Sequence, residues 1–148
     1  MLTNELIESY KATTYCVSSL NLHIRIDEKD PMLELTLKNQ DAKTWAFITA
    51  WNPKSRELSL AENQTRNQNL LAQLKSQGFS TYEGIGIPDD GDWTPEESLF
   101  IPCISRQYAT ELGIQYGQNA IVFGEVGKIA ELVVISLGIN QESSRSTN

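Results

Sequence analysis

The chain has 148 residues, of which 40% are hydrophobic and 21% are charged, and its formal net charge is -7 at pH 7. This size and composition indicate one folded domain and exclude a disordered chain or a second independent core. The acidic balance repels phosphate backbones and anionic lipid surfaces, so we expect neither nucleic acid nor a membrane as a partner.

The first residues and the two cysteines indicate a cytoplasmic location. The opening segment, MLTNELIESYK, lacks the basic and apolar regions of a signal peptide. No apolar run approaches the roughly 18 residues of a membrane span. Cys16 and Cys103 lie far apart among apolar or β-prone neighbours, as is typical of reduced thiols.

Helix and strand signals alternate along the chain. Residues 44–51, TWAFITAW, form a nearly continuous apolar run, which is typical of a central strand covered on both faces. The best-defined helix begins after Ser59, whose spacing to Glu62 predicts a capping box, and Gly78 ends it. In chain order we predict helix 2–11, strands 13–17 and 20–26, a helix from Asp30-Pro31 through Leu37, strand 44–51, helix 59–77, strand 79–87, a turn at 88–92, strand 98–104, a helix from Ser105 to Gly113, and strands 119–125 and 129–135 joined as a hairpin.

Strands separated by helices predict an α/β or α+β fold, in which a mixed β-sheet is flanked by helices. We expect a single domain over residues 1–139. The last nine residues, NQESSRSTN, have no apolar anchor, and we expect residues 140–148 to form a disordered tail.

Polar residues gather where the apolar strand ends and the long helix begins. On that helix Asn63 and Asn67 share a stripe with Leu70 and Leu74, at positions where a structural helix would carry leucine or alanine. Either this end of the helix projects beyond the core, or the two amides face something polar.

The strand exit supplies further polar groups. In α/β sheets ligands bind outside the carboxyl ends of strands, and a helix N-terminus favours anions. Trp51 and Asn52 stand at this exit, and Arg56 and Arg66 add local positive charge. These residues predict a site for a polar or anionic molecule, although a core tryptophan and solvated cations would account for the same pattern.

Two more segments contribute candidates. Trp93 offers a second stacking face, and Glu96 is a candidate general base, unless it is a solvated turn carboxylate. Gln118 and Asn119 follow two glycines and present amides either to a ligand or to loop backbone groups.

Several reaction classes are disfavoured. His23 is the only histidine and lies in an alternating strand, and no nucleophile motif accompanies it, which argues against Ser-His-Asp and Cys-His hydrolases. One histidine and two distant cysteines give no zinc-ligand spacing, and the aspartates near residue 90 do not match a calcium loop. We expect no metal and no cofactor.

The chain resembles the bacterial family called domain of unknown function 3293. The segments ITAWNP-x-S and LG-x-x-YGQNAIV carry the resemblance most specifically. The resemblance implies a self-contained domain and brings no known activity or catalytic residue. Its matching segments are residues 10–15, 48–56, 62–63, 66–67, 93–98 and 112–122.

Two functions remain open. The first is a cytoplasmic domain that binds, and acts on, a polar or anionic small molecule such as a nucleotide or sugar phosphate. The alternative is a regulatory or interaction protein that docks a protein partner through its acidic surface, with its amides paired to backbone groups. The sequence leaves open whether the protein is an enzyme.

Overall fold

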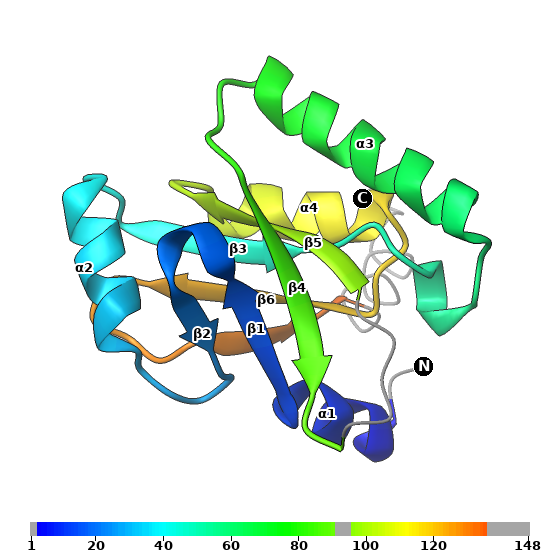
Figure 1. The fold of residues 1–148 in the computed structure, drawn as a ribbon, viewed down its shortest axis with the longest axis horizontal. Coiled ribbons are helices and arrows are strands. Elements are labelled where there is room, and N and C mark those ends of the chain that lie inside the picture. The colour runs from blue at the N-terminus through cyan, green and yellow to red at the C-terminus, as the bar shows by residue number, and fades with distance from the viewer. Residues whose placement is uncertain (1–2, 91–95, 136–148) are drawn as a thin grey trace, which may run out of the picture.

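The structure is a computed structural model that describes residues 3–90 and 96–135. Figure 1 shows helices packed around one seven-stranded sheet. The helices are α1 (Asn4–Lys11), α2 (Pro31–Asn39), α3 (Leu60–Ser76) and α4 (Arg106–Gln115), with short 3-10 turns at Ser18–Leu20 and Pro53–Ser55. The strands are β1 (Thr13–Val17), β2 (Leu22–Ile24), β3 (Thr44–Ile48), β4 (Tyr82–Pro88), β5 (Glu96–Pro102), β6 (Ala120–Glu125) and β7 (Glu131–Val134).

Each helix begins at a side chain that caps it. Thr3 accepts the Leu6 N–H before α1, and Asp30 accepts the Met32 N–H before α2. At α3 both bonds of the predicted capping box form, between Ser59 and Glu62. The predicted helix starts at Asp30, Ser59 and Ser105 are therefore confirmed, whereas α1 begins at Asn4 rather than at residue 2.

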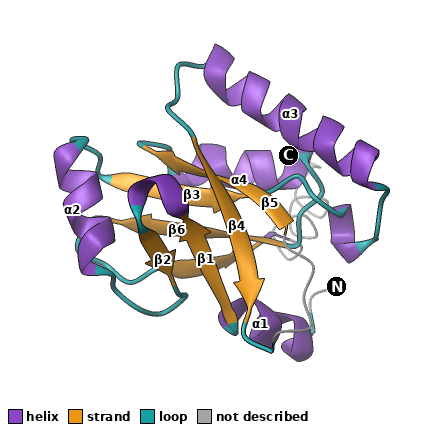
Figure 2. Ribbon diagram, in the orientation of Figure 1, coloured by secondary structure: helices purple, strands orange, loops and turns teal. Residues whose placement is uncertain are grey.

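The sheet has the strand order β2-β1-β4-β5-β3-β6-β7, and every pair of adjacent named strands is antiparallel. A short parallel bridge joins Ile26, after β2, to Ala130, before β7. There the Asp27 N–H donates to the Ala130 carbonyl at 2.7 Å, and the Ala130 N–H donates to the Glu28 carbonyl at 3.0 Å. The two edges of the sheet meet at this bridge, so the sheet curls towards a closed barrel. Figure 2 shows the strands crossing one another in this curl.

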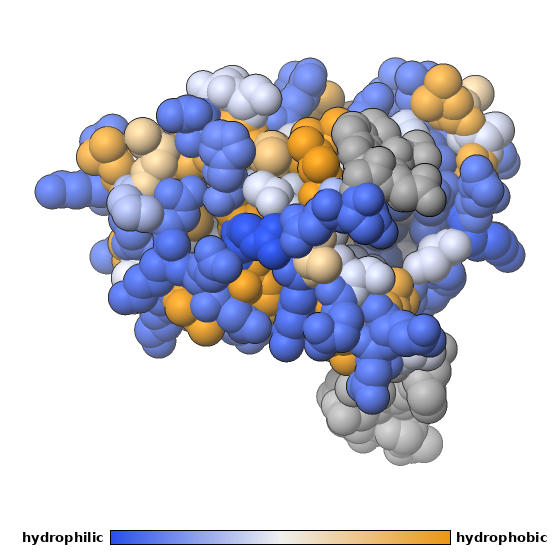
Figure 3. Space-filling view, turned by 60° about the horizontal axis from the view of Figure 1, so that its bottom comes forward, coloured by the Kyte–Doolittle hydropathy of each residue, from blue (hydrophilic) through white to orange (hydrophobic). Residues whose placement is uncertain are grey.

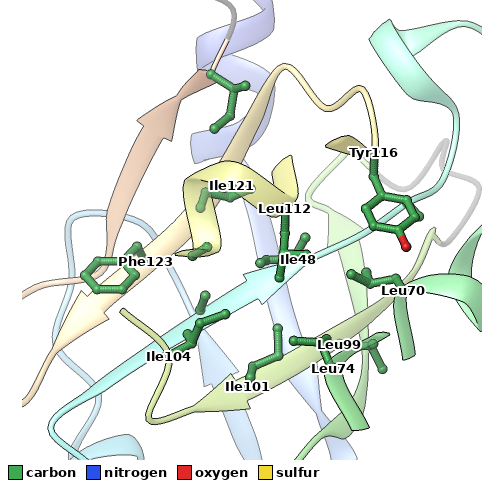
Figure 4. Close-up of a cluster of buried hydrophobic side chains, with 14 residues drawn as sticks. Ile48, Leu70, Leu74, Leu99, Ile101, Ile104, Leu112, Tyr116, Ile121 and Phe123 are labelled. Carbon is green, nitrogen blue, oxygen red and sulfur yellow. The ribbon is translucent and has the colours of Figure 1, made fainter. Parts of the chain in front are cut away.

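The curled sheet has two buried faces. Along β3, Ala46 and Ile48 face outward into a core that is completed by Leu70 of α3 and Leu112 of α4. Figure 4 shows this outer core, with side chains from strands and helices converging between α3, α4 and the sheet. The single domain with helices packed on a sheet is confirmed.

The inner face forms the second core. Trp45 and Phe47 of β3 point inward and pack with Phe100 of β5 and with Leu37 of α2. Glycines make room for the two β3 rings, because a Cβ on Gly84 would lie 2.5 Å from Phe47 and one on Gly124 would lie 2.4 Å from Trp45. Helix α2 closes the interior beside the start of β3.

The observed strands differ from the predicted ones at their ends. β3 stops at Ile48, because the backbone leaves the sheet before Trp51. β4 begins at Tyr82 rather than residue 79, and β5 begins at Glu96 rather than residue 98. The predicted tail, residues 140–148, lies outside the described residues. Within the described part of the chain, no helix is both long enough and apolar enough to cross a membrane.

Candidate functional site

A cavity of about 260 Å³ lies at the other end of the curled sheet, beside α1. In Figure 1, α1 lies at the bottom, below the end of β4. Because the strands are antiparallel, the ends of β3 and β4 meet the starts of β1, β5 and β6 at this rim. Its described lining residues are Leu6, Ser9, Tyr10, Thr13, Tyr15, Phe47, Thr49, Trp51, Asn52, Ser55, Gly86, Pro88, Glu96, Ser98, Gln118, Asn119, Ala120, Ile121 and Val122.

The polarity of the interior changes along the strands. Successive residues of a strand point to opposite faces, so Phe47 and Thr49 both point inward. Near α2 the inward positions are apolar, whereas at the cavity they carry Thr13, Thr49, Glu96 and Ser98. A purely structural core would hold aliphatic side chains at these positions. The cavity wall therefore carries polar side chains at positions that face the interior.

Glu96 is the one carboxyl group among the described lining residues. It is half-buried, and burial raises its pKa above the usual value. No described residue forms a hydrogen bond or ion pair with its carboxylate. Burial also raises the pKa of the Tyr10 phenol to about 12, with a smaller contribution from the charge of Glu96. Both shifts favour the neutral forms of these two groups.

Gln118 is only 6% exposed, and its amide has a fixed orientation. Its Nε2 donates to the backbone carbonyls of Trp51 at 3.1 Å and of Tyr116 at 3.3 Å. These bonds occupy both amide hydrogens, whereas its Oε1 has no hydrogen-bond donor among the described residues. An amide oxygen without a partner remains in the cavity wall.

Asn119 is 9% exposed and belongs to the same wall. Its Nδ2 donates to Oγ of Ser55 at 3.0 Å, which joins the start of β6 to the loop after β3. Its Oδ1 accepts no hydrogen bond from a described residue. The two neighbouring amides therefore both leave an acceptor oxygen available.

The loop after β3 is strained and firmly held. Asn52, Lys54 and Ser55 all adopt positive φ angles of 44°, 55° and 60°, which non-glycine residues rarely take. The Lys54 N–H donates to the Gly117 carbonyl at 2.7 Å, and a Cβ on Gly117 would lie 2.9 Å from Pro53. A glycine at position 117 thus lets the start of β6 pack directly on this loop.

Asn63 and Asn67 of α3 hold the same loop from the helix side. Asn63 is 2% exposed and exchanges two hydrogen bonds with Asn52. Asn67 accepts the Ala50 N–H at 2.8 Å and donates to the Glu97 carbonyl at 2.7 Å. Both amides are paired mainly to backbone groups, so these two asparagines shape the wall and do not line the cavity.

Arg66 and Arg56 have different surroundings. Arg66 donates from Nε to the Ala50 carbonyl at 2.7 Å and from a terminal nitrogen to the Tyr116 carbonyl. Its guanidinium group also lies over the Tyr116 ring, 5.9 Å from the centroid. Arg56 is exposed, and neither arginine lines the cavity.

The structure thus places five of the predicted residues in the cavity wall, whereas Asn63, Arg66 and Asn67 bond to the segment after β3 without lining the cavity, and Arg56 is exposed. Trp93 lies outside the described residues. Several lining residues were not predicted from the sequence, including Tyr10, Thr13, Thr49 and Ser98. A pattern in the sequence could have indicated inward-facing positions, because polar or aromatic residues recur two apart as Thr-x-Tyr, Thr-x-Trp and Glu-x-Ser. The predicted residues in the cavity wall are Trp51, Asn52, Glu96, Gln118 and Asn119.

The described lining of the cavity contains one acidic side chain and no cationic one. No lysine, arginine or histidine occurs among the described lining residues, and Glu96 is acidic. Across residues 3–90 and 96–135, no group of three or more His, Cys, Asp or Glu side chains could hold a metal ion. Figure 3 shows that hydrophilic side chains cover most of one face of the molecule, with hydrophobic residues only in separate patches.

These features define a class of protein: a single α+β domain whose curled antiparallel sheet holds a polar cavity at one end. The family model described as "Protein of unknown function (DUF3293)" matches residues 48–121. This match covers half of the chain, so the chain belongs to that family, and the predicted resemblance is confirmed. The matched segment contains all of β4 and β5, the last residue of β3 and the first two residues of β6, and α1 and β1 lie outside it. No curated protein and no solved structure matches the chain.

Proposed function

We propose that the protein binds a small polar molecule in the cavity beside α1. The observation that carries this proposal is the placement of Glu96, Gln118 and Asn119 at buried or half-buried wall positions, with acceptor oxygens that no described residue pairs. Buried polar atoms in native proteins are almost always hydrogen-bonded to protein, water or ligand. A ligand that donates hydrogen bonds would satisfy all three.

The size and charge of the cavity narrow the ligand. A volume of about 260 Å³ lies near the lower end of the range of ligand pockets, which is roughly 300–1,000 Å³. An anionic ligand would meet Glu96 without a compensating cation, because Arg66 is bonded elsewhere and Arg56 is exposed. We therefore favour a neutral or cationic molecule over the phosphate-like ligand that the sequence suggested.

Glu96 also gives the site a group for proton transfer. Its raised pKa brings the carboxyl closer to the pH of the cell, where a general acid or base is most effective. If the bound molecule is converted to a product, Glu96 is the residue that we propose as proton donor or acceptor. A cytoplasmic location in a bacterial cell fits this proposal, and docking of a protein partner through the acidic surface stays the alternative.

A cavity-filling variant tests the proposal. A Cβ on Gly86 would lie 3.4 Å from Thr13 and 3.7 Å from Tyr15, which is ordinary contact, and the two further methyl groups of Gly86→Val would narrow the cavity; circular dichroism establishes that the variant is folded. Glu83→Val on the outward face of the same strand is the matched control. Native mass spectrometry of mildly purified protein, with a thermal-shift screen of small polar compounds, gives the readout.

The expected result is a small molecule retained or stabilising in the parent protein and in Glu83→Val, and lost in Gly86→Val. Equal binding by Gly86→Val would place the ligand elsewhere. Absence of any retained or stabilising small molecule in the parent protein would contradict the proposal.

A further inference from the structure

Building on the proposed binding function, we infer that the cavity selects a small organic cation. An ammonium or guanidinium group would lie against the Glu96 carboxylate and the surrounding aromatic rings. Three independent features of the wall carry this inference, namely its charge, its aromatic residues and its excess of hydrogen-bond acceptors.

The first feature is an acid without a local counter-charge. Glu96 lies half-buried in a wall whose described residues include no lysine, arginine or histidine. Arg25, whose charge acts on the lining residue Tyr15, is already paired, because it makes an ion pair with Asp89 at 2.8 Å and lies near Glu28 at 3.9 Å. A buried carboxylate without a partner is unfavourable, and a bound cation removes that penalty.

The second feature is an aromatic lining. Tyr10 from α1, Tyr15 from β1, and Phe47 and Trp51 from β3 and the loop after it all line the cavity. Tyr15 and Phe47 pack edge to face, with ring centroids 5.2 Å apart. Aromatic faces attract ammonium and guanidinium groups, most strongly where water is excluded. Rings and a carboxylate in one cavity therefore favour a cation over a neutral molecule of the same shape.

The third feature is an excess of acceptors. The amide hydrogens of Gln118 are committed to two backbone carbonyls, and the Tyr15 hydroxyl donates to the Tyr10 carbonyl at 2.8 Å. Asn119 likewise uses its Nδ2 on Ser55. The wall therefore offers a ligand acceptor oxygens on Glu96, Gln118 and Asn119, beside donors such as the Tyr10 hydroxyl and the Trp51 indole N–H. Ammonium and guanidinium groups carry only donors and complement such a wall.

Cation binding is linked to the protonation of Glu96. The titratable groups that share the cavity with Glu96 are Tyr10 on α1 and Tyr15 on β1, and burial holds both phenols neutral. The lining residues from β3, β4 and β6 do not titrate. A cation that contacts the carboxylate lowers the pKa of Glu96, so binding releases a proton where Glu96 is protonated in the empty cavity. Affinity for the cation therefore falls as the pH is lowered through the pKa of Glu96.

Isothermal titration calorimetry with matched probes tests the inference. The probes are butylamine and methylguanidinium as cations, butyramide as the neutral analogue and butyrate as the anion. At pH 8 we expect both cations to bind at least about tenfold more tightly than butyramide, and butyrate to bind most weakly. Buffers of different ionisation enthalpy, used at acidic pH, are expected to reveal proton release with the cations alone.

Glu96→Gln isolates the carboxylate. This variant keeps the shape of the side chain, and we expect it to lose at least about tenfold in cation affinity with butyramide binding unchanged. Glu97→Gln, on the outward face of the same strand, is the matched control and is expected to bind as the parent protein does. Circular dichroism establishes that both variants are folded.

The results of these experiments distinguish the cation inference from the proposed binding function. Preferential binding of butyramide or butyrate, or equal cation binding by Glu96→Gln, would overturn the cation inference and leave the proposed binding function in place. Failure of all four probes would also overturn the cation inference. The binding function itself fails only on the separate Gly86→Val and native mass spectrometry results.

Discussion

Asn63 holds Asn52 at both its backbone and its side chain. The Asn52 N–H donates to Oδ1 of Asn63, and Nδ2 of Asn63 donates to Oδ1 of Asn52, each at 2.8 Å. Oδ1 of Asn52 also accepts the Leu58 N–H at 3.0 Å. One amide pair thus holds the left-handed residue that begins the loop beside the cavity.

Removing the Asn63 side chain should destabilise the fold. Asn63→Ala leaves the half-buried Asn52 N–H without its acceptor and leaves Asn52 Oδ1 only the Leu58 N–H, so we expect the free energy of unfolding to fall by about 1–3 kcal/mol. Asn69→Ala is the control, since Asn69 is exposed on the same helix, and its effect should stay within about 0.5 kcal/mol. Urea denaturation measures both, and similar values for the two would show that the amide pair contributes little.

Arg66 and Arg56 should also differ in how much their side chains contribute to the free energy of unfolding. Arg66→Ala removes the bonds to the carbonyls of Ala50 and Tyr116, and we expect it to lower the free energy of unfolding by about 2 kcal/mol. Arg56→Ala removes an exposed side chain, and we expect a change below about 0.5 kcal/mol. Thermal and urea unfolding provide the comparison. A ligand-binding loss in Arg66→Ala without a stability loss would return Arg66 to the binding site.

Glu96 should make stability depend on pH. Its pKa in the folded protein lies above the ordinary value of 4.5, so the folded state binds the proton more tightly than the unfolded state does. Its contribution to stability is fully present below pH 4.5 and is lost as the pH rises through the folded pKa. We expect Glu96→Gln to be more stable than the parent protein at pH 7 and to flatten this part of the profile in urea denaturation.

The pKa of Asp89 shifts in the opposite direction, so its effect on stability serves as an internal reference for that of Glu96. The Arg25 guanidinium lowers the pKa of Asp89 below 3.8, so this carboxylate stabilises the fold above that pH and the stabilisation is lost as the pH falls through the folded pKa. The two effects therefore occupy different pH windows. Glu97→Gln, which changes an exposed carboxylate of the same strand, is the control, and the same flattening in that variant would rule out Glu96 as the source.

Two inward-facing glycines of β4 should respond differently to one methyl group. Gly84→Ala places a Cβ 2.5 Å from the buried Phe47 ring, and we expect a loss of about 1–3 kcal/mol in the free energy of unfolding. Gly86→Ala meets Thr13 at 3.4 Å, so we expect the stability to change by less than about 1 kcal/mol. Parallel denaturation curves measure both, and equal losses would mean that Phe47 has room to move.

Local chemistry explains why much of the fold could be predicted. The capping box at Ser59 and Glu62, proline at the start of α2, and the hairpin of β6 and β7 depend on residues close together in the sequence. The strand order depends on distant pairings such as Cys16 with Ile85, for which no local pattern exists. The curl of the sheet and the bridge between Ile26 and Ala130 therefore could not be predicted from the sequence.

The candidate site was predicted only in part, because it too depends on contacts between residues that are far apart in the sequence. Asn63 and Asn67 were recognised as unusual helix residues, yet an amide that braces a loop and an amide that binds a ligand look alike in a sequence. Glu96 and Ser98 enter the cavity because β5 begins early enough for both to point inward, while Glu97 points outward. Only the register with β4 fixes that choice.

The bridge between Ile26 and Ala130 also bears on how the protein folds. It joins two segments from nearly opposite ends of the described chain, so the loop that must close is long and its entropic penalty is high. Hairpins such as β6 with β7 can form early, whereas the ring of strands closes only when these distant segments meet. We therefore expect the cavity to form late in folding, and the edges of β2 and β7 to stay exposed in partly folded chains until the bridge forms.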